Sequence, residues 1–448
     1  MHPLFHRSMI SIAAPRRVQL MRMIQGRIGW NASQVREFQE QRLRETIRYC
    51  WDFVPYYREK WQGYLSRPED ITCIADLERL PILTKDEYRS NRNLLEAAAP
   101  NLKCSEGRTG GSTGKPILYQ TCHEDEETAW GQMYTGWSWA GYRLGDPFLV
   151  IGGESIGVGL SDRRTKKDRV MNRWVTSGSN ITLERVRHFS TSPIFKKIRF
   201  IYGYPNSIRE YGEQLHRLGI RFPYLRGIVC TAEVMTDETR SRIHECFGAE
   251  VRILDQWGMF DGGIQGCESI EHNGLHVHFH SGMLEIVDDD GKQISEPNKV
   301  GRGLATSFTN TCTPFVRYDT GDMVHWLEDT PYASGVRWPR IGPVDGRTGD
   351  VIYLPSGRSI PMPGLTLVMR WIDDLYQYQF IQTGPQAVEA RLNPGPGFAM
   401  SKDEIERFLR ARISDEIDWT IALGPPQLTP NGKLLIIRND WKRNQGCA

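Results

Sequence analysis

The stretch Pro147-Phe148-Leu149-Val150-Ile151-Gly152-Gly153 decides the fold, because it is an apolar run that ends in two glycines. Such a run is typical of a strand buried on both faces of a parallel sheet. Three similar runs follow, at 200–205, 227–231 and 251–256, and the segment 236–247 before the last of them has a helical pattern. Strands that alternate with helices predict an α/β fold.

On the amino-terminal side, the spacing of apolar residues predicts a helix over 33–53 and a tryptophan-rich helix over 125–141. A strand is expected at 117–119. The texture changes over 274–322, where short strands alternate with turns such as Asp289-Asp290-Gly291. This pattern predicts a small β-subdomain beside two α/β subdomains.

A polar, glycine-rich stretch over 342–350 is the predicted domain boundary. Beyond it, a helix over 401–413 lies between strand candidates at 377–382 and 434–437. We therefore expect a large amino-terminal domain over 1–345 and a small, mobile α+β carboxy-terminal domain over 346–448.

Length and composition describe a soluble globular protein of two or three domains: 448 residues, 39% hydrophobic, with a formal net charge of +2. The small net charge excludes a general affinity for nucleic acid. No apolar run reaches the roughly 18 residues that a membrane span needs. Nine cysteines are scattered without a Cys-x-x-Cys pair, which favours a reducing, cytoplasmic location over a disulfide framework.

The amino-terminal 36 residues carry six arginines and no acidic residue, the first acid being Glu37. A basic amphipathic helix can rest on an anionic membrane surface. A solvated or docked helix is the favoured interpretation.

The segment Thr109-Gly110-Gly111-Ser112-Thr113-Gly114-Lys115-Pro116 is rich in groups that bind anions. Its glycines let the backbone approach a ligand closely, and such a loop can aim several N–H groups at one anion. Its hydroxyls and its lysine add donors and a positive charge, so phosphate oxygens are the expected ligand. An ordinary glycine-rich surface turn is the alternative.

A Walker A loop is excluded by the spacing. That motif needs a glycine five residues before Gly114 and a hydroxyl residue after Lys115. This chain has Thr109 and Pro116 at those positions.

Five further motifs follow in order along the chain: Thr231-Ala232-Glu233, Asp255-Gln256-Trp257-Gly258-Met259-Phe260-Asp261, Arg317-Tyr318-Asp319-Thr320-Gly321-Asp322, Gly346-Arg347-Thr348-Gly349-Asp350 and Pro430-Asn431-Gly432-Lys433. Together with the glycine loop, they resemble the adenylate-forming superfamily, and within it the phenylacetate–CoA ligase group. The stretch Val54-Pro55-Tyr56-Tyr57-Arg58 resembles the members found in capsular polysaccharide clusters.

The resemblance implies a role for each motif. The loop from Thr109 to Lys115 would hold the β- and γ-phosphates of ATP. Residues Thr231 to Glu233 and Asp255 to Trp257 would line the adenine slot. The remaining roles are these: Asp322 accepts hydrogen bonds from the ribose, Arg347 approaches the ribose or the α-phosphate, Asp261 holds Mg²⁺, Asp350 lies at the hinge, and Lys433 reaches the reacting phosphate.

The chemistry asks for these residue types. When a carboxylate attacks the α-phosphate and pyrophosphate leaves, charge grows on phosphoryl oxygens, so cations and N–H donors are needed there. Mg²⁺ takes one or two carboxylates besides phosphate. A lysine on a separate domain completes the site only on closure. Each residue also has a simpler explanation: Asp322 in a turn, Arg347 in a linker, Lys433 in a hairpin and Glu233 at a helix start.

Three departures from the family pattern affect the expected site. Phe260 and Asp261 stand where the family has a hydroxyl residue and a glutamate, and Trp257 replaces a tyrosine. The shorter acid changes metal reach, which leaves an inactive nucleotide-binding scaffold as one hypothesis. The retained glycine loop, Asp322 and Lys433 favour an active enzyme.

Structural zinc is a further possibility that the resemblance suggests. Its candidate ligands are Cys267, His272, His276 and Cys312, residue types that suit tetrahedral zinc. Their spacing matches no compact zinc signature, so unliganded histidines and a free buried cysteine are favoured.

The leading functional hypothesis is an AMP-forming ligase that activates a carboxylic acid and passes the acyl group to coenzyme A. An amine or hydroxyl acceptor is the alternative. Four aromatic residues are candidates for the acyl pocket, although such residues more often form core: Trp130, Trp137, Trp139 and Tyr204.

Overall fold

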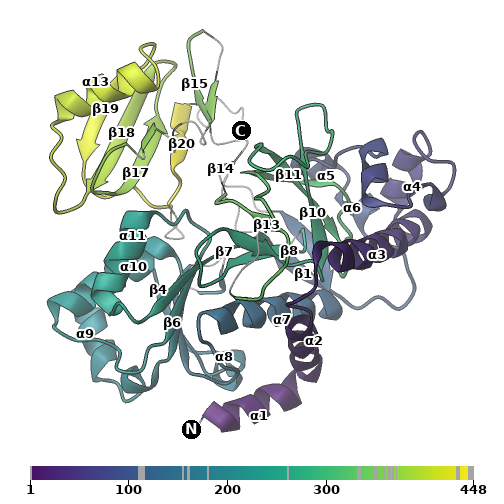
Figure 1. The fold of residues 1–448 in the computed structure, drawn as a ribbon, viewed down its shortest axis with the longest axis horizontal. Coiled ribbons are helices and arrows are strands. Elements are labelled where there is room, and N and C mark those ends of the chain that lie inside the picture. Colours follow the sequence, from purple (N-terminus) through teal and green to yellow (C-terminus); the bar gives the residue numbers. More distant parts are fainter. Residues whose placement is uncertain are drawn as a thin grey trace.

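A computed structural model confirms the α/β class (Figure 1). It describes the following residues: 3–108, 117–153, 156–158, 162–178, 181–259, 262–329, 334–344, 346–347, 351–356, 359–361, 365, 368–369, 371–429 and 434–441.

The largest element is an eight-stranded sheet with the order β13-β9-β8-β7-β6-β5-β3-β4. The strands from β4 to β7 run parallel, and β7, β8, β9 and β13 pair antiparallel. Their bounds are β3 Phe148–Gly152, β4 Arg173–Ser177, β5 Phe200–Gly203, β6 Gly227–Thr231, β7 Arg252–Met259, β8 Ile264–Glu268, β9 Leu275–Val277 and β13 Arg340–Ile341.

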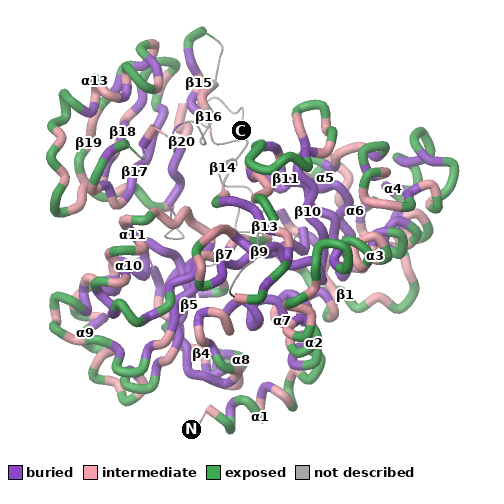
Figure 2. Tube along the Cα trace, viewed as in Figure 1, coloured by how far each residue is buried: buried purple, intermediate pink, exposed green. Residues whose placement is uncertain are grey.

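Helices cover both faces of the parallel strands, so strand side chains alternate between two cores. Leu149 and Ile151 pack with helices α9 (Leu183–Thr191), α10 (Pro205–Arg217) and α11 (Asp237–Phe247). Phe148 and Val150 pack on the other face against Trp137 of α7 (His123–Trp139). Burial on both faces explains why these strands are continuous apolar runs. Figure 2 shows the parallel strands as buried.

The predicted β-rich part forms a four-stranded sheet of order β10-β11-β12-β14. Its strands are β10 Gly282–Val287, β11 Gly301–Ser307, β12 Tyr318–Val324 and β14 Gly346–Arg347. A hairpin of β1 (Cys104–Arg108) and β2 (Leu118–Cys122) pairs Arg108 with Leu118. The glycine loop joins these two strands in the sequence and lies outside the described residues.

The basic amino-terminal segment forms two helices, and the second is docked. Helix α2 packs on α7, where Arg17 and Glu127 form a buried ion pair with an Nη2–Oε1 distance of 2.6 Å. Asn31 and Gln34 form a capping box at the start of the long helix that follows. The helices outside the sheet layers are α1 Pro3–Ala13, α2 Pro15–Gly26, α3 Ala32–Phe53, α4 Pro55–Trp61, α5 Lys85–Ser90, α6 Arg92–Leu95 and α8 Lys166–Val170.

The carboxy-terminal part has a sheet and a core of its own. Its strands have the order β19-β18-β17-β20 and pack with helix α13 (Lys402–Arg412). The strands are β17 Leu375–Gln382, β18 Ala387–Pro394, β19 Asp418–Leu423 and β20 Ile437–Asn439, and a hairpin of β15 Val351–Tyr353 and β16 Ser359–Pro361 precedes them. Within the described ranges, no helix is both long and apolar enough to cross a bilayer.

A disulfide between Cys104 and Cys312 contradicts the expectation of unpaired cysteines. The two residues are 208 positions apart, so the pair could not be predicted from a local cysteine spacing. The tertiary fold brings them together, because the β1–β2 hairpin packs on the turn that contains Cys312. There, Gln120 N–H donates to Thr313 Oγ1 at 3.1 Å, and Asn310 Nδ2 donates to Gln120 O at 3.0 Å.

Candidate functional site

The ends of β6 and β7 bring two predicted motifs side by side. Thr231 is the last residue of β6, and its Cα partner is Gln256 on β7. Parallel neighbours end at the same edge of a sheet, which is where α/β folds bind ligands. Ala232 follows with φ of 68°, in the left-handed region. This local conformation turns the chain off the sheet edge directly after Thr231.

The side chain of Gln256 is held by a hydrogen bond from a core residue. Trp137 Nε1 donates to Gln256 Oε1 at 3.0 Å, and both side chains are buried. Two of the four aromatic residues considered for an acyl pocket, Trp137 and Tyr204, have almost no exposed surface. These two therefore belong to the core, and Trp137 also orients a predicted site residue.

Three motifs that are distant in the sequence converge at Asp322. Trp257 Nε1 donates to Asp322 Oδ2 at 2.9 Å. Asp322 N–H donates to Thr320 Oγ1 at 3.0 Å, and Arg347 on β14 is the Cα partner of Asp322. Asp322 is only 4% exposed. The carboxylate predicted for the ribose therefore lies beside the tryptophan predicted for the adenine slot.

Glu233 contacts two other parts of the chain. Its Oε2 accepts a hydrogen bond from Asn206 Nδ2 at 2.8 Å, and its Oε1 accepts one from the backbone N–H of Leu434 at 2.9 Å. Asn206 is in the first turn of α10 and Leu434 precedes β20. Glu233 thus bridges the large sheet and the carboxy-terminal part, a role that its motif did not predict.

A polar cluster supports Asp255 from the side of α11 and β8. Arg240 donates to both oxygens of Glu268 at 3.0 Å, and Glu268 Oε2 accepts the N–H of Asp255 at 2.8 Å. Burial and the neighbouring Glu268 carboxylate raise the pKa of Asp255 to about 7. The contacts with His272 and Arg240 lower the pKa of Glu268 against its burial. Sequence reasoning missed Arg240 and Glu268, because only the packing of α11 beside β7 joins them.

The zinc candidates are not brought together. Cys312 is bonded to Cys104, while Cys267 is buried on β8, where burial raises the pKa of its thiol well above the usual range. His272 Nδ1 lies 3.3 Å from Glu268 Oε2 and 3.2 Å from Arg240 Nη1. Among the described residues, no three His, Cys, Asp or Glu side chains form a group suited to a metal ion. The residues present therefore do not fit the suggested structural zinc.

Several predicted site residues lie outside the described part of the chain, and their roles stay predictions. They are Thr109, Gly110, Gly111, Ser112, Thr113, Gly114, Lys115, Asp261, Asp350 and Lys433. For Arg347, the backbone alone is described.

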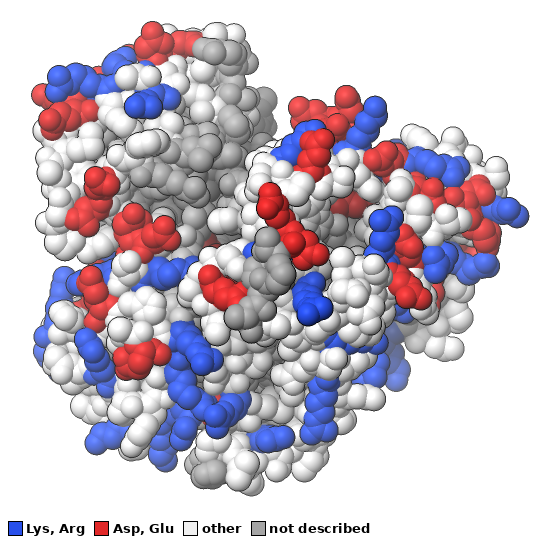
Figure 3. All heavy atoms as spheres, viewed as in Figure 1, with Lys and Arg blue, Asp and Glu red and all other residues white. Residues whose placement is uncertain are grey.

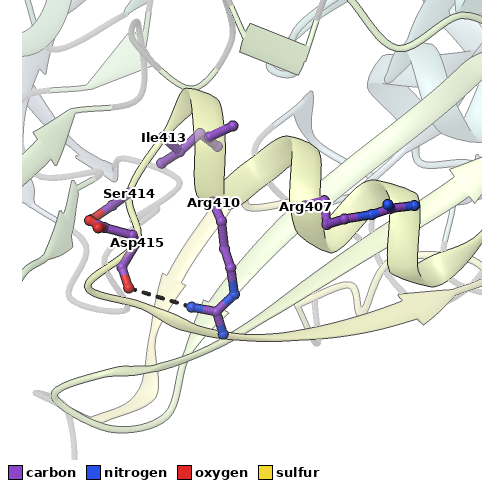
Figure 4. A pocket seen from close by; sticks show the side chains of 6 residues that line it. Arg407, Arg410, Ile413, Ser414 and Asp415 are labelled. Carbon is purple, nitrogen blue, oxygen red and sulfur yellow. Dashed lines mark hydrogen bonds between the residues drawn. The ribbon is translucent and has the colours of Figure 1, made fainter.

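A pocket on the carboxy-terminal part of the chain is lined by other residues than those predicted for the site. It is lined by Arg407, Arg410, Ala411, Ile413, Ser414 and Asp415, at the end of α13 (Figure 4). Arg410 Nη1 donates to the backbone oxygen of Asp415 at 3.4 Å. None of these lining residues is a predicted site residue.

On the face shown in Figure 3, acidic and basic side chains are interspersed, with basic ones more frequent over the lower part.

Comparisons with known proteins place this geometry in context. No family model matches the chain. The phenylacetate-coenzyme A ligase of Pseudomonas putida is 25% identical over 362 residues, which cover 78% of this chain and 79% of that protein. Protein CapK of Staphylococcus aureus is 24% identical over 359 residues, which cover 77% of this chain and 75% of CapK.

Among solved structures, 2-hydroxyisobutyryl-CoA ligase in the postadenylation state, in complex with R3-HIB-AMP, matches with a TM-score of 0.72. The match covers 94% of each chain at 16% identity. The chain therefore has the fold of an adenylate-forming CoA ligase. In sequence, it is similar to phenylacetate–CoA ligases and to CapK, as its motifs indicated.

Proposed function

We propose that this protein is an AMP-forming ligase that activates a carboxylic acid with ATP and transfers the acyl group to coenzyme A. The observation that carries the proposal is the meeting of Trp257 and Asp322, with Arg347 opposite in the sheet, beside the ends of β6 and β7. An indole beside a carboxylate suits a base and a ribose diol, and an arginine at position 347 has the charge that a phosphate requires.

Different residues at this edge of the sheet bind different parts of the nucleotide. Thr231 to Glu233 and Asp255 to Trp257 line the adenine slot, and Asp322 accepts hydrogen bonds from the ribose. The residue types of the sequence suit Mg²⁺ and ATP: Asp261 would supply a hard oxygen ligand, and the loop Thr109–Lys115 would supply N–H and hydroxyl donors to the terminal phosphates.

The chemical step is assigned to the carboxy-terminal part, 346–448, which we propose as a domain distinct from 1–345. Lys433 places its ammonium against the α-phosphate as the carboxylate oxygen attacks and pyrophosphate leaves. Asp350 serves as the hinge between the domains. The support for this division is the separate sheet and core of the carboxy-terminal part.

The similarity to phenylacetate-coenzyme A ligases over three quarters of the chain supports coenzyme A as the acceptor. Magnesium and a role in polysaccharide biosynthesis are part of the same proposal, the latter supported by the similarity to CapK.

The test is ATP–pyrophosphate exchange with a panel of carboxylic acids that spans aromatic, short aliphatic and hydroxy acids. The proposal predicts exchange with at least one acid without coenzyme A, and a thioester when coenzyme A is added. An acyl product that forms with amines or sugars instead would move the proposal to the alternative acceptor. Tight ATP binding without exchange for any acid would indicate a nucleotide-binding scaffold.

A further inference from the structure

The carboxylate of Glu233 joins three segments that are far apart in the sequence. It follows β6, and it accepts hydrogen bonds from Asn206 of α10 at 2.8 Å and from the backbone N–H of Leu434 at 2.9 Å. Hydrogen bonds to an ionised acceptor are roughly twice as strong as neutral ones. Glu233 therefore ties the segment before β20 to the edge of the large sheet.

The surrounding contacts fix the same orientation of the carboxy-terminal sheet. Thr239 Oγ1 donates to the backbone oxygen of Tyr376 at 3.2 Å, and the Arg209 guanidinium lies 5.3 Å from the centre of the Tyr376 ring. Val234, the residue after Glu233, packs against the carboxy-terminal core. Glu233 thus sits inside an interface in which α10 and α11 meet β17.

The partner atom of Glu233 has a particular place in the sequence. Leu434 directly follows Lys433, and consecutive Cα atoms are about 3.8 Å apart. The acceptor therefore restrains the backbone N–H of residue 434, the described residue that follows the lysine in the sequence. The contact is to backbone, so it restrains the chain beside the lysine whatever side chain residue 434 carries.

We propose that Glu233 is a positioning residue for Lys433. Its carboxylate holds the backbone next to the lysine against the end of β6, in the orientation that adenylation needs. This inference rests on the proposed function and deepens it, because it gives the Glu233 carboxylate a part in turnover, while the backbone of residues 231–233 borders the adenine slot. The acid of the Thr-Ala-Glu motif then links the edge that binds the nucleotide to the domain that carries the reacting lysine.

Hydrogen exchange of the intact protein tests the contact without any enzymatic activity. In Glu233→Ala, the peptide that contains the Leu434 amide exchanges at least about tenfold faster than in the wild type, since the amide loses its acceptor. Glu233→Gln retains an amide oxygen that accepts the same N–H, and falls between the two. The matched control is Asp237→Asn, an exposed carboxylate at the start of α11, which leaves this peptide unchanged. Equal exchange in the wild type and Glu233→Ala overturns the proposal.

Kinetics then separate positioning from nucleotide binding. Removing a hydrogen bond to a charged group corresponds to a change of about ten- to a hundredfold, and a group that acts through Lys433 alters kcat rather than KM. We expect kcat for pyrophosphate exchange to fall by that factor in Glu233→Ala, with KM for ATP within about twofold and partial rescue in Glu233→Gln. A rise in KM at constant kcat would make Glu233 a binding residue and overturn the inference. A wild type without exchange would refute the proposed function, whereas the hydrogen-exchange result reports on the Glu233 contact by itself.

Discussion

The edge of the large sheet and the carboxy-terminal sheet differ in how their polar groups are held. At the edge, Gln256 is fixed by the buried Trp137 and Asp322 by Trp257, all within one continuous body. The carboxy-terminal sheet has its own core and meets that body through polar contacts such as Glu233 with Leu434. The groups that we propose to bind the nucleotide are thus built into rigid structure, whereas the part that includes the proposed reacting lysine, Lys433, has an attachment that a single substitution can weaken.

The largest expected effect separates binding from chemistry. Lys433→Ala removes the cation that we propose stabilises charge on the α-phosphate, so exchange activity should fall by roughly a thousandfold, as for other electrostatic groups. ATP affinity, measured by calorimetry, stays within about threefold, because the edge residues are untouched. Equal losses of affinity and rate would show that the two regions are not divided in this way.

One core substitution in each region tests whether nucleotide binding and chemistry depend on different parts of the molecule. Leu409 of α13 is fully buried in the carboxy-terminal core, and Ile228 of β6 is fully buried in the large sheet. Each change to alanine costs about 2–5 kcal/mol of unfolding free energy, measured by urea denaturation. Leu409→Ala should lower exchange activity and leave ATP affinity intact, whereas Ile228→Ala should weaken ATP binding. The reverse pattern would contradict the assignment of roles.

A smaller effect is expected at Asp322. Asp322→Asn removes the charge that we propose accepts hydrogen bonds from the ribose hydroxyls, and ATP affinity should fall by roughly ten- to a hundredfold. The comparison variant is Trp257→Phe, which removes the indole N–H that donates to Asp322 but keeps an aromatic ring at the proposed adenine slot and leaves the carboxylate in place. Calorimetry that finds unchanged ATP affinity in Asp322→Asn would contradict the proposed contact between Asp322 and the ribose.

The smallest expected effect is a pH dependence of stability that comes from the large amino-terminal part of the molecule alone. Asp125 of α7 is buried and accepts hydrogen bonds from Thr309 Oγ1 at 2.5 Å and Thr121 Oγ1 at 3.0 Å. Burial raises its pKa to about 6. The folded protein therefore binds more protons than the unfolded chain between about pH 4 and 6, and this group's stabilisation is lost as the pH rises.

In Asp125→Asn this dependence disappears. Between pH 4 and pH 7, the unfolding free energy of the wild type should fall by about 2 kcal/mol relative to that of the variant. Denaturant melts at the two pH values measure it. A difference between the two proteins that stays constant with pH would contradict the shifted pKa.

The strands and helices of the two bodies were largely predictable from local patterns. The runs at 147–153 and 227–231 became β3 and β6, and the helices predicted over 33–53 and 401–413 became α3 and α13. These elements are continuous apolar runs or have clear caps, such as Asn31 and Ser401. Their type is therefore set by their own residues.

Long-range pairing was not predictable in the same way. The Cys104–Cys312 disulfide and the Arg240–Glu268 pair join segments that are far apart in the sequence and are brought together by the tertiary fold. The motifs indicated Trp257 and Asp322 separately, and the resemblance assigned them to one site, but no local signal showed that they hydrogen-bond. Glu233 has the residue type that a helix start favours, so its contact with Leu434 was hidden by a simpler explanation.

The most direct measurement is a crystal structure of the protein with ATP. This account predicts the base at the ends of β6 and β7, between residues 231–233 and 255–257, with a ribose hydroxyl within hydrogen-bonding distance of Asp322. It also predicts the terminal phosphates against Gly111 and its neighbours. A nucleotide bound elsewhere, with Asp322 and the glycine segment remote from it, would contradict the account.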